Sequence, residues 1–352
     1  MKEIQLFIND MPVTVPPGST VLEAAKAAGV EIPTLCHHPN LTNAGACRIC
    51  VVEIKGVRNL PSACMQPAAQ GMKVYTESDR VVGARQEILR LIIANHPLDC
   101  LTCESGGACK LQDYCYQYGV ADTPYAGAVS DRPVLDCNPF IQRDYRKCIL
   151  CGQCVRACAE VQGNFAIDFA NRGFAAEIAA PYGEDLEDGG CTFCGHCLDV
   201  CPTGALQGKI GKGLGRAWQK ERVKTTCAYC GVGCNFYLEV KDGKIVGVAP
   251  DFEAVVNKGH LCVKGRFGWD FIHSNKRLTR PLLRKDGNLQ PVSWEKALSV
   301  VAEKLGEVKA EHGPDSLGFL SSARCTNEEN FLLQKFARVV IGTNNIDHCA
   351  RL

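Results

Sequence analysis

The order of apolar and polar residues near the start of the chain predicts a hairpin followed by a helix. Alternating apolar positions over Ile4–Ile8 and Met11–Val15 are typical of two half-buried strands joined by a tight turn. Thr20 and Glu23 have the spacing of a helix capping box, and Gly29 lies where such a helix would end. The N-terminal part of the chain therefore predicts a small mixed α/β unit.

Later patterns extend this picture along the rest of the chain. We expect further strands at Val51–Lys55, Lys73–Thr76, Asn235–Val240, Lys244–Val248 and Leu317–Leu320, and helices at Ser78–Asn95, Ser293–Glu311 and from Thr326 or Asn327 to Gly342. The final helix, strand and helix with short connections are typical of the opening of an α/β domain. The predicted fold class is a multidomain α+β protein.

Charge and hydropathy narrow the range of partners. The 352 residues carry a formal net charge of +1, so no global field favours nucleic acid or an anionic membrane. The first residues lack the pattern of a signal peptide, and no apolar run approaches the roughly 20 residues that span a bilayer. We therefore expect a cytoplasmic protein with no nucleic-acid partner and no membrane span.

Cysteine is the residue type that changes the picture most, with 23 in the chain. A disulfide scaffold is one explanation, but such scaffolds are usually short and secreted. Cytosolic thiols stay reduced, and clustered cysteines there more often bind metal. The spacing of the cysteines then indicates which metal centre each group would hold.

The first cysteine group lies within the N-terminal α/β unit. Cys36, Cys47, Cys50 and Cys64 are separated by ten, two and thirteen residues, so we expect Cys47 and Cys50 to hold one edge of a centre and the other two to close it. Four thiolates suit a [2Fe–2S] cluster, and a zinc site is the alternative. The group resembles the N-terminal [2Fe–2S] domain of complex I's large peripheral subunit and of iron-only hydrogenases. That resemblance implies the iron–sulfur cluster and a β-grasp-like fold.

One histidine and three cysteines follow the first long helix: His96, Cys100, Cys103 and Cys109. Three thiolates need a fourth ligand, which imidazole can supply, and Cys115 is the rival. The run resembles the [4Fe–4S] site with one histidine and three cysteine ligands in the same two families. Imidazole in place of a thiolate makes a cluster less negative, so its reduction potential is expected to be higher.

Two runs of the pattern C-x2-C-x2-C-x3-C form an internal repeat, CILCGQCVRAC and CTFCGHCLDVC. This is the signature of a two-cluster ferredoxin, in which the fourth cysteine of each run binds the other run's cluster. The two predicted [4Fe–4S] ligand sets are Cys148, Cys151, Cys154 and Cys201, and Cys158, Cys191, Cys194 and Cys197. We expect His196 to lie beside the ligands or in solvent, and Cys137 to be a buried thiol.

A different cysteine pattern follows, in which Cys227, Cys230 and Cys234 are joined by the distant Cys262. It resembles the N-terminal [4Fe–4S] domain of molybdenum and tungsten bis-pyranopterin enzymes. Lys264 matches the lysine that lies between cluster and pterin in that family, so the resemblance implies a role as electron relay. A solvated surface lysine is the alternative.

Residues 208–224 connect the repeat to this last pattern and carry six basic residues against one acid. A flexible, solvated linker is the favoured interpretation. A basic face for an acidic partner or a cofactor phosphate is the alternative.

The final stretch, SSARCTNEENFLLQKFARVVIGTNNIDHCARL, resembles the catalytic subunits of formate dehydrogenases of the same pterin family. In that family the next residue is the cysteine or selenocysteine that binds molybdenum or tungsten. The resemblance therefore implies no catalytic residue up to Leu352. Our hypothesis is a selenoprotein reading frame that ends at its UGA selenocysteine codon; an artificial cut and a genuinely short protein are the alternatives.

The modules occur in the order that cytoplasmic, multi-cluster formate dehydrogenases have. We expect a [2Fe–2S] domain at residues 1–78, the histidine-ligated [4Fe–4S] domain at 79–120, a two-cluster ferredoxin domain at 136–207, a linker at 208–224, the pterin-type [4Fe–4S] domain at 225–280 and the incomplete start of an α/β molybdopterin domain at 281–352.

The resemblance implies an enzyme that, at full length, interconverts formate and carbon dioxide at a molybdenum or tungsten bis-pyranopterin guanine dinucleotide centre. One [2Fe–2S] and four [4Fe–4S] clusters would connect this centre to a partner: a flavin NAD(P)H-oxidising subunit, a ferredoxin or a hydrogenase. The alternatives are a stand-alone electron carrier and a subunit of an iron-only hydrogenase or a complex I-like NADH dehydrogenase. We expect Cys325 and Cys349 to be buried thiols outside these sites.

Overall fold

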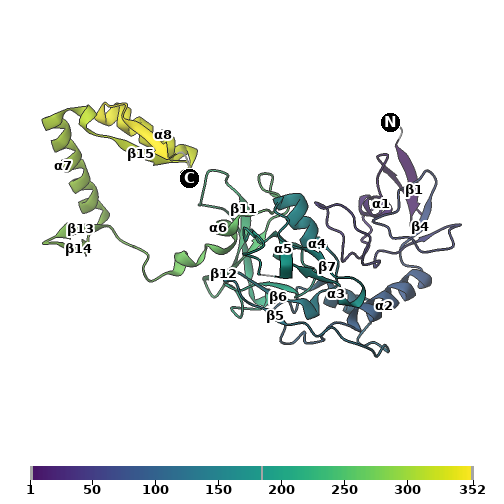
Figure 1. Cartoon of the computed structure of the whole chain (residues 1–352). Coiled ribbons are helices and arrows are strands. Elements are labelled where there is room, and N and C mark those ends of the chain that lie inside the picture. The colour runs from purple at the N-terminus through teal and green to yellow at the C-terminus, as the bar shows by residue number, and fades with distance from the viewer. Residues whose placement is uncertain (1–2, 184, 350–352) are drawn as a thin grey trace.

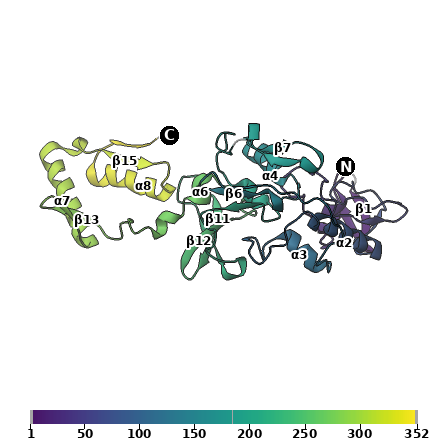
Figure 2. The ribbon, with the colours of Figure 1, turned by 60° about the horizontal axis from the view of Figure 1, so that its bottom comes forward.

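The computed structural model describes residues 3–183 and 185–349. The molecule is extended: the N-terminal module lies at one end, the modules around the cysteine repeat lie in the middle, and the C-terminal segment lies at the other end (Figures 1 and 2). The metal-ligand position predicted after Leu352 lies outside the described residues.

Four strands and one helix form the N-terminal module. β1 (Ile4–Ile8) pairs antiparallel with β2 (Met11–Val15) and parallel with β4 (Lys73–Tyr75), and β3 (Glu53–Ile54) completes the sheet in the order β2-β1-β4-β3. Helix α1 (Val21–Ala27) shares a buried apolar core with these strands. The module is the small α/β unit that the alternating pattern predicts.

The predicted beginning of α1 is confirmed. Thr20 Oγ1 accepts a hydrogen bond from the Glu23 N–H at 3.2 Å, and Glu23 Oε2 accepts one from the Thr20 N–H at 2.7 Å. Both bonds satisfy N–H groups that have no partner inside the helix. The strand predicted at Val51–Lys55 is reduced to the two residues of β3, because Val51 makes only an isolated bridge to Ser62.

Two helices form the next module. α2 (Asp79–Ile93) begins at Ser78, whose Oγ accepts a hydrogen bond from the Val81 N–H at 3.4 Å. α3 (Lys110–Gln117) packs against α2 through a second apolar core. The helix predicted at Ser78–Asn95 is thus confirmed, with its last turn shorter by two residues.

Arg85 ties this helical module to the N-terminal one. Its side chain is 0% exposed and donates to Glu77 at 2.6 Å, to the Tyr118 hydroxyl at 2.7 Å and to the Val51 carbonyl at 3.0 Å. A buried cation is stable only with partners of this kind. Because Val51 belongs to the N-terminal module, Arg85 fixes α2 against it.

The central module is built around the cysteine repeat. Its strands are β5 (Val134–Leu135), β6 (Ile141–Asp144) and β9 (Leu206–Gly208) in one antiparallel sheet, and the hairpin of β7 (Asp168–Ala170) and β8 (Glu177–Ala179). Its helices are α4 (Gln153–Arg156), which continues as a π-helical turn over Ala157–Gln162, and α5 (His196–Val200). Each of α4 and α5 begins inside one cysteine run, so the repeat in sequence is also a repeat in structure.

A three-stranded antiparallel sheet follows the repeat. It consists of β10 (Glu221–Thr226), β11 (Asn235–Lys241) and β12 (Lys244–Pro250), and α6 (Val263–Phe267) packs next to β12. The β11–β12 hairpin confirms the predicted one.

The segment at residues 208–224, predicted to be a flexible, solvated linker, contains no buried residue but makes hydrogen bonds to another module. Arg216 donates to the backbone oxygen of Leu101 at 2.8 Å, and the Gly213 N–H donates to Glu104 at 3.2 Å. Both acceptors lie in the loop of the preceding helical module. The basic segment is therefore anchored across two modules.

The C-terminal segment has a β-α-β order. Its elements are the hairpin of β13 (Leu282–Lys285) and β14 (Asn288–Pro291), α7 (Trp294–His312), and the parallel pair β15 (Phe319–Ser322) and β16 (Ile346–Cys349), joined by α8 (Asn327–Lys335) and its π-helical continuation Phe336–Ile341. This order agrees with the predicted opening of an α/β domain. β15 begins two residues later than predicted, because a 3-10 turn at Pro314–Ser316 precedes it.

The remaining helical segments are short. Single 3-10 turns occupy Tyr145–Lys147, Gly173–Ala175, Pro181–Gly183, Ala217–Gln219 and Asp270–His273. Within residues 3–183 and 185–349, no helix combines the length and the apolar character needed to cross a membrane.

Candidate iron–sulfur sites

The four N-terminal cysteines meet at one place in the module. Cys50 Sγ lies 3.4 Å from Cys64 Sγ, and the Cys47 N–H lies 3.5 Å from Cys36 Sγ. Cys36, Cys50 and Cys64 are buried in the module. Side-chain hydrogen bonds also join Cys36 to Cys47 and to Cys64, so the four thiols form one connected group. Four thiolates in one group suit a [2Fe–2S] cluster, and the assignment of Cys47 and Cys50 to one edge of it stays a prediction.

Hydrogen bonds among these thiols shift their pKa values in opposite directions. Hydrogen bonds from Cys47 and Cys64 lower the pKa of Cys36 to about 2, and one from Cys64 lowers the pKa of Cys50 to about 7. The same hydrogen bonds, together with burial, raise the pKa of Cys47 and of Cys64. The site thus holds thiolate charge that a bound cation would neutralise, and metal binding would release its remaining protons.

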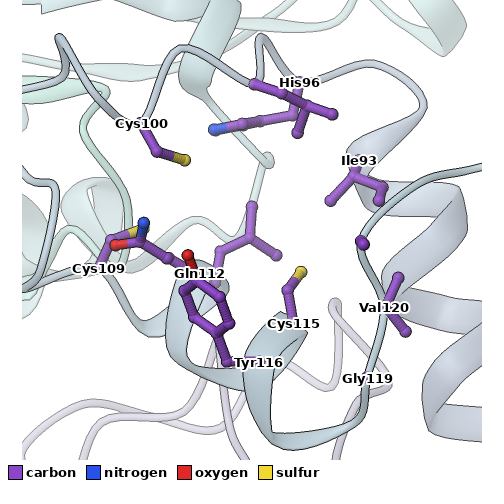
Figure 3. Close-up of a pocket in the computed structure, with 12 residues that line it drawn as sticks. Ile93, His96, Cys100, Cys109, Gln112, Cys115, Tyr116, Gly119 and Val120 are labelled. Carbon is purple, nitrogen blue, oxygen red and sulfur yellow. The ribbon is translucent and has the colours of Figure 1, made fainter.

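A cavity of about 360 Å³ lies between α2 and α3, and His96, Cys100 and Cys109 line it (Figure 3). The ring of His96 is directed toward Cys100, and Cys115 points into the same space from α3 (Figure 3). His96 Nδ1 is buried without a hydrogen-bond partner, and burial lowers the pKa of the ring. A neutral imidazole is the form that binds metal, so the histidine fits the ligand role.

The third predicted cysteine ligand of this site faces a different neighbour. Cys103 is buried, but its Sγ lies 2.7 Å from where a Cβ would stand on Gly204. It is not among the residues that line the cavity. The cavity is therefore lined by three of the four predicted ligands and by the rival Cys115. Burial raises the pKa of the Cys115 thiol to about 11.

The cysteine repeat forms two separate sites with crossed ligand sets. One cavity of about 20 Å³ is lined by Cys148, Cys151, Cys154 and Cys201, and a second of about 30 Å³ by Cys158, Cys191, Cys194 and Cys197. The fourth cysteine of each run lies with the first three of the other, in the arrangement that the ferredoxin pattern predicts. Burial raises the pKa of the innermost thiols, Cys154 and Cys197.

Backbone N–H groups approach the sulfurs at equivalent places in the two runs. The Leu150 N–H lies 3.4 Å from Cys148 Sγ, and the Phe193 N–H lies 3.3 Å from Cys191 Sγ. Hydrogen bonds to sulfur stabilise a thiolate ligand and raise the reduction potential of a cluster bound to it.

The last cysteine group lies between β10, β11 and α6. The Cys227 N–H donates to the Cys234 carbonyl at 2.8 Å, and Cys227 Sγ lies 3.7 Å from where a Cβ would stand on Gly265 in α6. Burial raises the pKa of Cys227, with the charges of Cys262 and Cys230 adding to it. Lys264 is exposed in the first turn of α6, and its ammonium forms no ion pair with the residues that the structure describes.

Among the described residues, no group of three or more His, Cys, Asp or Glu side chains is placed to hold a single metal ion. Four thiolates, or three thiolates with one imidazole, are donor sets of the kind that hold iron–sulfur clusters.

His196 lies beside the ligands, which is one of the two places expected for it. It is only 5% exposed, and its Nε2 accepts a hydrogen bond from the Leu261 N–H at 3.2 Å. Burial lowers its pKa to about 4. Cys137 is exposed, not buried, because it lies in the loop after β5 and faces Asp185. Cys325 is half-buried.

Sequence comparison assigns a domain family to each of these regions. The matches are a 2Fe-2S iron-sulfur cluster binding domain at residues 1–79, an NADH-ubiquinone oxidoreductase-G iron-sulfur binding region at 85–124, the ferredoxin-like domain of NADH-quinone oxidoreductase subunit 3 at 138–207, a molybdopterin oxidoreductase Fe4S4 domain at 220–274 and a molybdopterin oxidoreductase region at 277–352. The chain thus belongs to the oxidoreductases in which N-terminal iron–sulfur domains precede a molybdopterin oxidoreductase region.

Three relatives share this region of sequence. The NADPH-Fe(3+) oxidoreductase subunit alpha of Geobacter sulfurreducens is 39% identical over 99% of this chain, and an NADH-quinone oxidoreductase subunit of Rhizobium meliloti is 38% identical over 99%. A Staphylococcus aureus protein provisionally named a formate dehydrogenase is 34% identical over 96% of the chain. The chain spans 40%, 40% and 38% of the length of these relatives.

A solved structure resembles part of this chain. A chain of NAD+-reducing [NiFe]-hydrogenase in the H2-reduced state is 33% identical and superposes with a TM-score of 0.55. The match covers 58% of this chain and 87% of that chain. Together the comparisons show that the chain carries iron–sulfur domains of oxidoreductases along most of its length.

Proposed function

We propose that this chain is the electron-transfer arm of the catalytic subunit of a formate dehydrogenase or carbon dioxide reductase. It connects a molybdenum or tungsten bis-pyranopterin guanine dinucleotide site with a redox partner subunit. The observation that carries the proposal is the unbroken series of cysteine-rich sites from the molybdopterin oxidoreductase region to the N-terminal module of one extended fold.

The proposed clusters are one [2Fe–2S] and four [4Fe–4S]. The proposed ligand sets are Cys36, Cys47, Cys50 and Cys64; His96, Cys100, Cys103 and Cys109; Cys148, Cys151, Cys154 and Cys201; Cys158, Cys191, Cys194 and Cys197; and Cys227, Cys230, Cys234 and Cys262. Bound clusters supply one-electron carriers, and the protein sets their potentials through ligand type, burial and hydrogen bonds to sulfur. The proposed domains end near residues 78, 120, 207, 224 and 280. The proposed location of the protein is the cytoplasm.

Contacts between neighbouring modules support close spacing of these sites. Pro202 follows Cys201, and its carbonyl accepts a hydrogen bond from the Lys110 N–H at 3.1 Å. The same carbonyl lies 3.7 Å from Cys109 Sγ. The histidine-ligated site therefore borders the ligand set that contains Cys201.

Lys264 is the proposed relay residue on the pterin side. It lies two residues after Cys262, in a helix that approaches Cys227 closely because Gly265 has no side chain. Its exposed ammonium is available to donate hydrogen bonds to a neighbouring group. A cation at this position would stabilise added negative charge nearby.

Formate is the proposed substrate of the whole protein. The C-terminal stretch supports it by its resemblance to formate dehydrogenases, and so does the Staphylococcus aureus relative. A second candidate is an NAD(P)H-linked oxidoreductase that does not use formate, since the relatives with 39% and 38% identity carry NADPH and NADH names. In both cases a partner subunit that handles nicotinamide, ferredoxin or hydrogen receives or supplies the electrons.

Metal analysis combined with paired assays of the full-length protein tests the proposal. We expect bound molybdenum or tungsten and formate-dependent reduction of a viologen dye. Protein that contains the metal but oxidises NADPH or NADH, and not formate, would support the second candidate. Protein with full iron content and neither metal would contradict both and leave an electron carrier.

A further inference from the structure

The two cysteine runs share a second pattern, at positions that bind no metal. Gln153 and His196 each precede the third cysteine of their run, and Arg156 and Asp199 each follow it by two residues. These positions are three residues apart, so on α4 and on α5 the two side chains lie on one face. We call Gln153 with Arg156 the first coupler, and His196 with Asp199 the second coupler.

The first coupler holds the loop of the N-terminal cysteine site. Gln153 Nε2 donates to the Leu35 carbonyl at 2.7 Å, and Leu35 immediately precedes Cys36. Arg156 Nη2 donates to the Cys36 carbonyl at 2.7 Å and to the Cys151 carbonyl at 3.2 Å. One guanidinium thus joins the backbones of two predicted ligands that belong to different sites.

The second coupler holds the segment that carries Cys262 in the same way. His196 Nε2 accepts from the Leu261 N–H at 3.2 Å, and Leu261 immediately precedes Cys262. Asp199 forms an ion pair with Arg266, in which the side chains are 8% and 4% exposed. The segment from Leu261 to Arg266 is therefore fixed to α5 at both of its ends.

The two couplers have opposite polarity. Gln153 donates its hydrogen bond, whereas His196 accepts one. Arg156 brings a cation to its partner loop, whereas Asp199 brings an anion to Arg266. Placing Arg266 against Arg156 would bring two cations together, one of them buried, so each flanking module matches only one end of the repeat.

Gly195 makes the second coupler possible. Its φ is +76°, and a Cβ on it would lie 2.9 to 3.1 Å from three side-chain atoms of Arg266. The guanidinium stem occupies the space that any other residue would fill. The close approach of α5 and the Cys262 segment therefore depends on this glycine.

We propose that the two couplers are positioning sites that set how closely the N-terminal site and the Cys227 site lie to the central pair. By holding the residue before Cys36 and the residue before Cys262, they fix the distance on which electron transfer in each direction depends. This inference rests on the proposed electron-transfer function. It makes the four coupler residues positioning residues and not metal ligands.

The test compares His196→Phe with His196→Gln in the full-length, cluster-loaded protein. Phenylalanine keeps a ring but removes the acceptor for the Leu261 N–H, and glutamine keeps an acceptor near the place of Nε2. In His196→Phe we expect the Leu261 amide to exchange about tenfold faster, the factor for loss of one hydrogen bond. In His196→Gln the exchange rate is expected to stay near that of the wild type.

The electronic readout is measured on chemically or photochemically reduced protein, so it needs no substrate. In His196→Phe we expect a weaker spin–spin interaction between the clusters at the Cys227 site and at the Cys191 set, at unchanged iron content. We also expect electron transfer between them to slow, because its rate falls as the distance between two clusters increases. If His196→Gln restores the spin–spin interaction and the electron-transfer rate, the effect of His196→Phe comes from the lost hydrogen bond and not from a general structural change.

Gln153→Leu is the matched control, because it removes the equivalent residue of the other run. We expect it to change amide exchange around Leu35 and the spectroscopic signal of the [2Fe–2S] cluster. The Cys227 site should stay unchanged. His196→Phe should show the reverse. The inference would be overturned if either variant affected the N-terminal site and the Cys227 site equally.

Asp199→Asn keeps the test decisive if His196→Phe loses iron. Asparagine retains the size and an acceptor for Arg266 but removes the charge. We expect full iron content, with weaker spin–spin interaction on the Cys227 side only. Wild-type interaction and transfer rates in Asp199→Asn would contradict the proposal, whereas absence of formate oxidation in wild-type protein would contradict only the proposed function.

Discussion

Two imidazole nitrogens, His96 Nδ1 and His196 Nδ1, are buried without hydrogen-bond partners. Leaving such a group unpaired costs about 1–3 kcal/mol, so it persists where another interaction needs the residue. For His96 that interaction is the proposed cluster ligation, and for His196 it is the hydrogen bond from the Leu261 N–H. At the residue scale, the unsatisfied nitrogens of these two histidines therefore coincide with positions proposed to bind a cluster or to hold a neighbouring segment.

The choice between His96 and Cys115 as fourth ligand is testable. We expect Cys115→Ser to keep full iron content and an unchanged midpoint potential, because His96 supplies the ligand. His96→Cys should keep the cluster but lower its potential by on the order of 100 mV, since a thiolate adds negative charge. Redox titration followed by electron paramagnetic resonance measures both. Loss of about four irons in Cys115→Ser would instead make Cys115 the ligand.

Arg85 is expected to contribute to stability through its buried hydrogen bonds. Arg85→Met leaves the Tyr118 hydroxyl and the Val51 carbonyl without their donor. We expect the free energy of opening of α2 to fall by about 3 kcal/mol, measured by native-state hydrogen exchange. Arg90→Met on the same helix is the control, because its ion pair with Glu87 is solvent-exposed. That control should change the free energy by less than about 0.5 kcal/mol.

At the scale of elements, the short helices α4 and α5 are more than carriers of cysteines. Each has a left-handed glycine before its first turn, Gly152 at φ +67° and Gly195 at φ +76°. Only glycine adopts this conformation without a steric cost, so the chain can turn tightly between the second and third cysteines of each run. The helices then present their coupler residues outward to neighbouring modules.

Gly195→Ala and Gly190→Ala separate backbone strain from steric contact. Both glycines have a positive φ, at +76° and +73°, so both variants share a cost of about 1–2 kcal/mol. Only at Gly195 does the new Cβ meet Arg266. We expect Gly195→Ala to lose about 1–3 kcal/mol more, measured by thermal unfolding of the loaded protein. Equal losses would mean that Arg266 moves aside without cost.

At the scale of the whole molecule, ion pairs join the modules. Lys147 of the central module lies 2.9 Å from Asp99 in the His96 loop and 3.5 Å from Asp144 at the end of β6. The ammonium is buried between two carboxylates, which compensate for its lost hydration. The relative placement of the modules therefore depends on charges as well as on apolar contact.

The Asp144 carboxyl makes this junction sensitive to acid. Burial alone would raise its pKa, but the hydrogen bond from Arg146 and the charge of Lys147 outweigh burial and lower the pKa. A carboxyl with a lowered folded-state pKa stabilises the fold above its unfolded pKa of about 3.9, and the contribution is lost as the pH falls through the folded value. We therefore expect Asp144→Asn to be less stable at pH 7.

Urea unfolding at a series of pH values from 7 to 3 measures this contribution. The free energy of unfolding of the wild type should fall more steeply below about pH 4 than that of Asp144→Asn. Parallel curves for the two proteins would show that Asp144 has the same pKa in the folded and unfolded states.

Features set by residues close together in the chain were predictable from the sequence. The capping box of Thr20 and Glu23 and the β11–β12 hairpin depend on short, fixed spacings. The first three cysteines of each run also lie close together in the chain, and the crossing of the fourth followed from the ferredoxin signature that the two runs share. The sequence therefore predicted the kinds of sites and their order.

Contacts between distant residues were decided only by the tertiary structure. Cys50 Sγ lies next to Cys64 Sγ, Cys137 lies exposed, and the basic segment at 208–224 is anchored to the loop that contains Leu101. The couplers join residues 118 and 65 positions apart in the chain, as in the hydrogen bonds of Gln153 and His196. Spacing in the sequence carries no information about such partners, because burial and packing of whole modules select them.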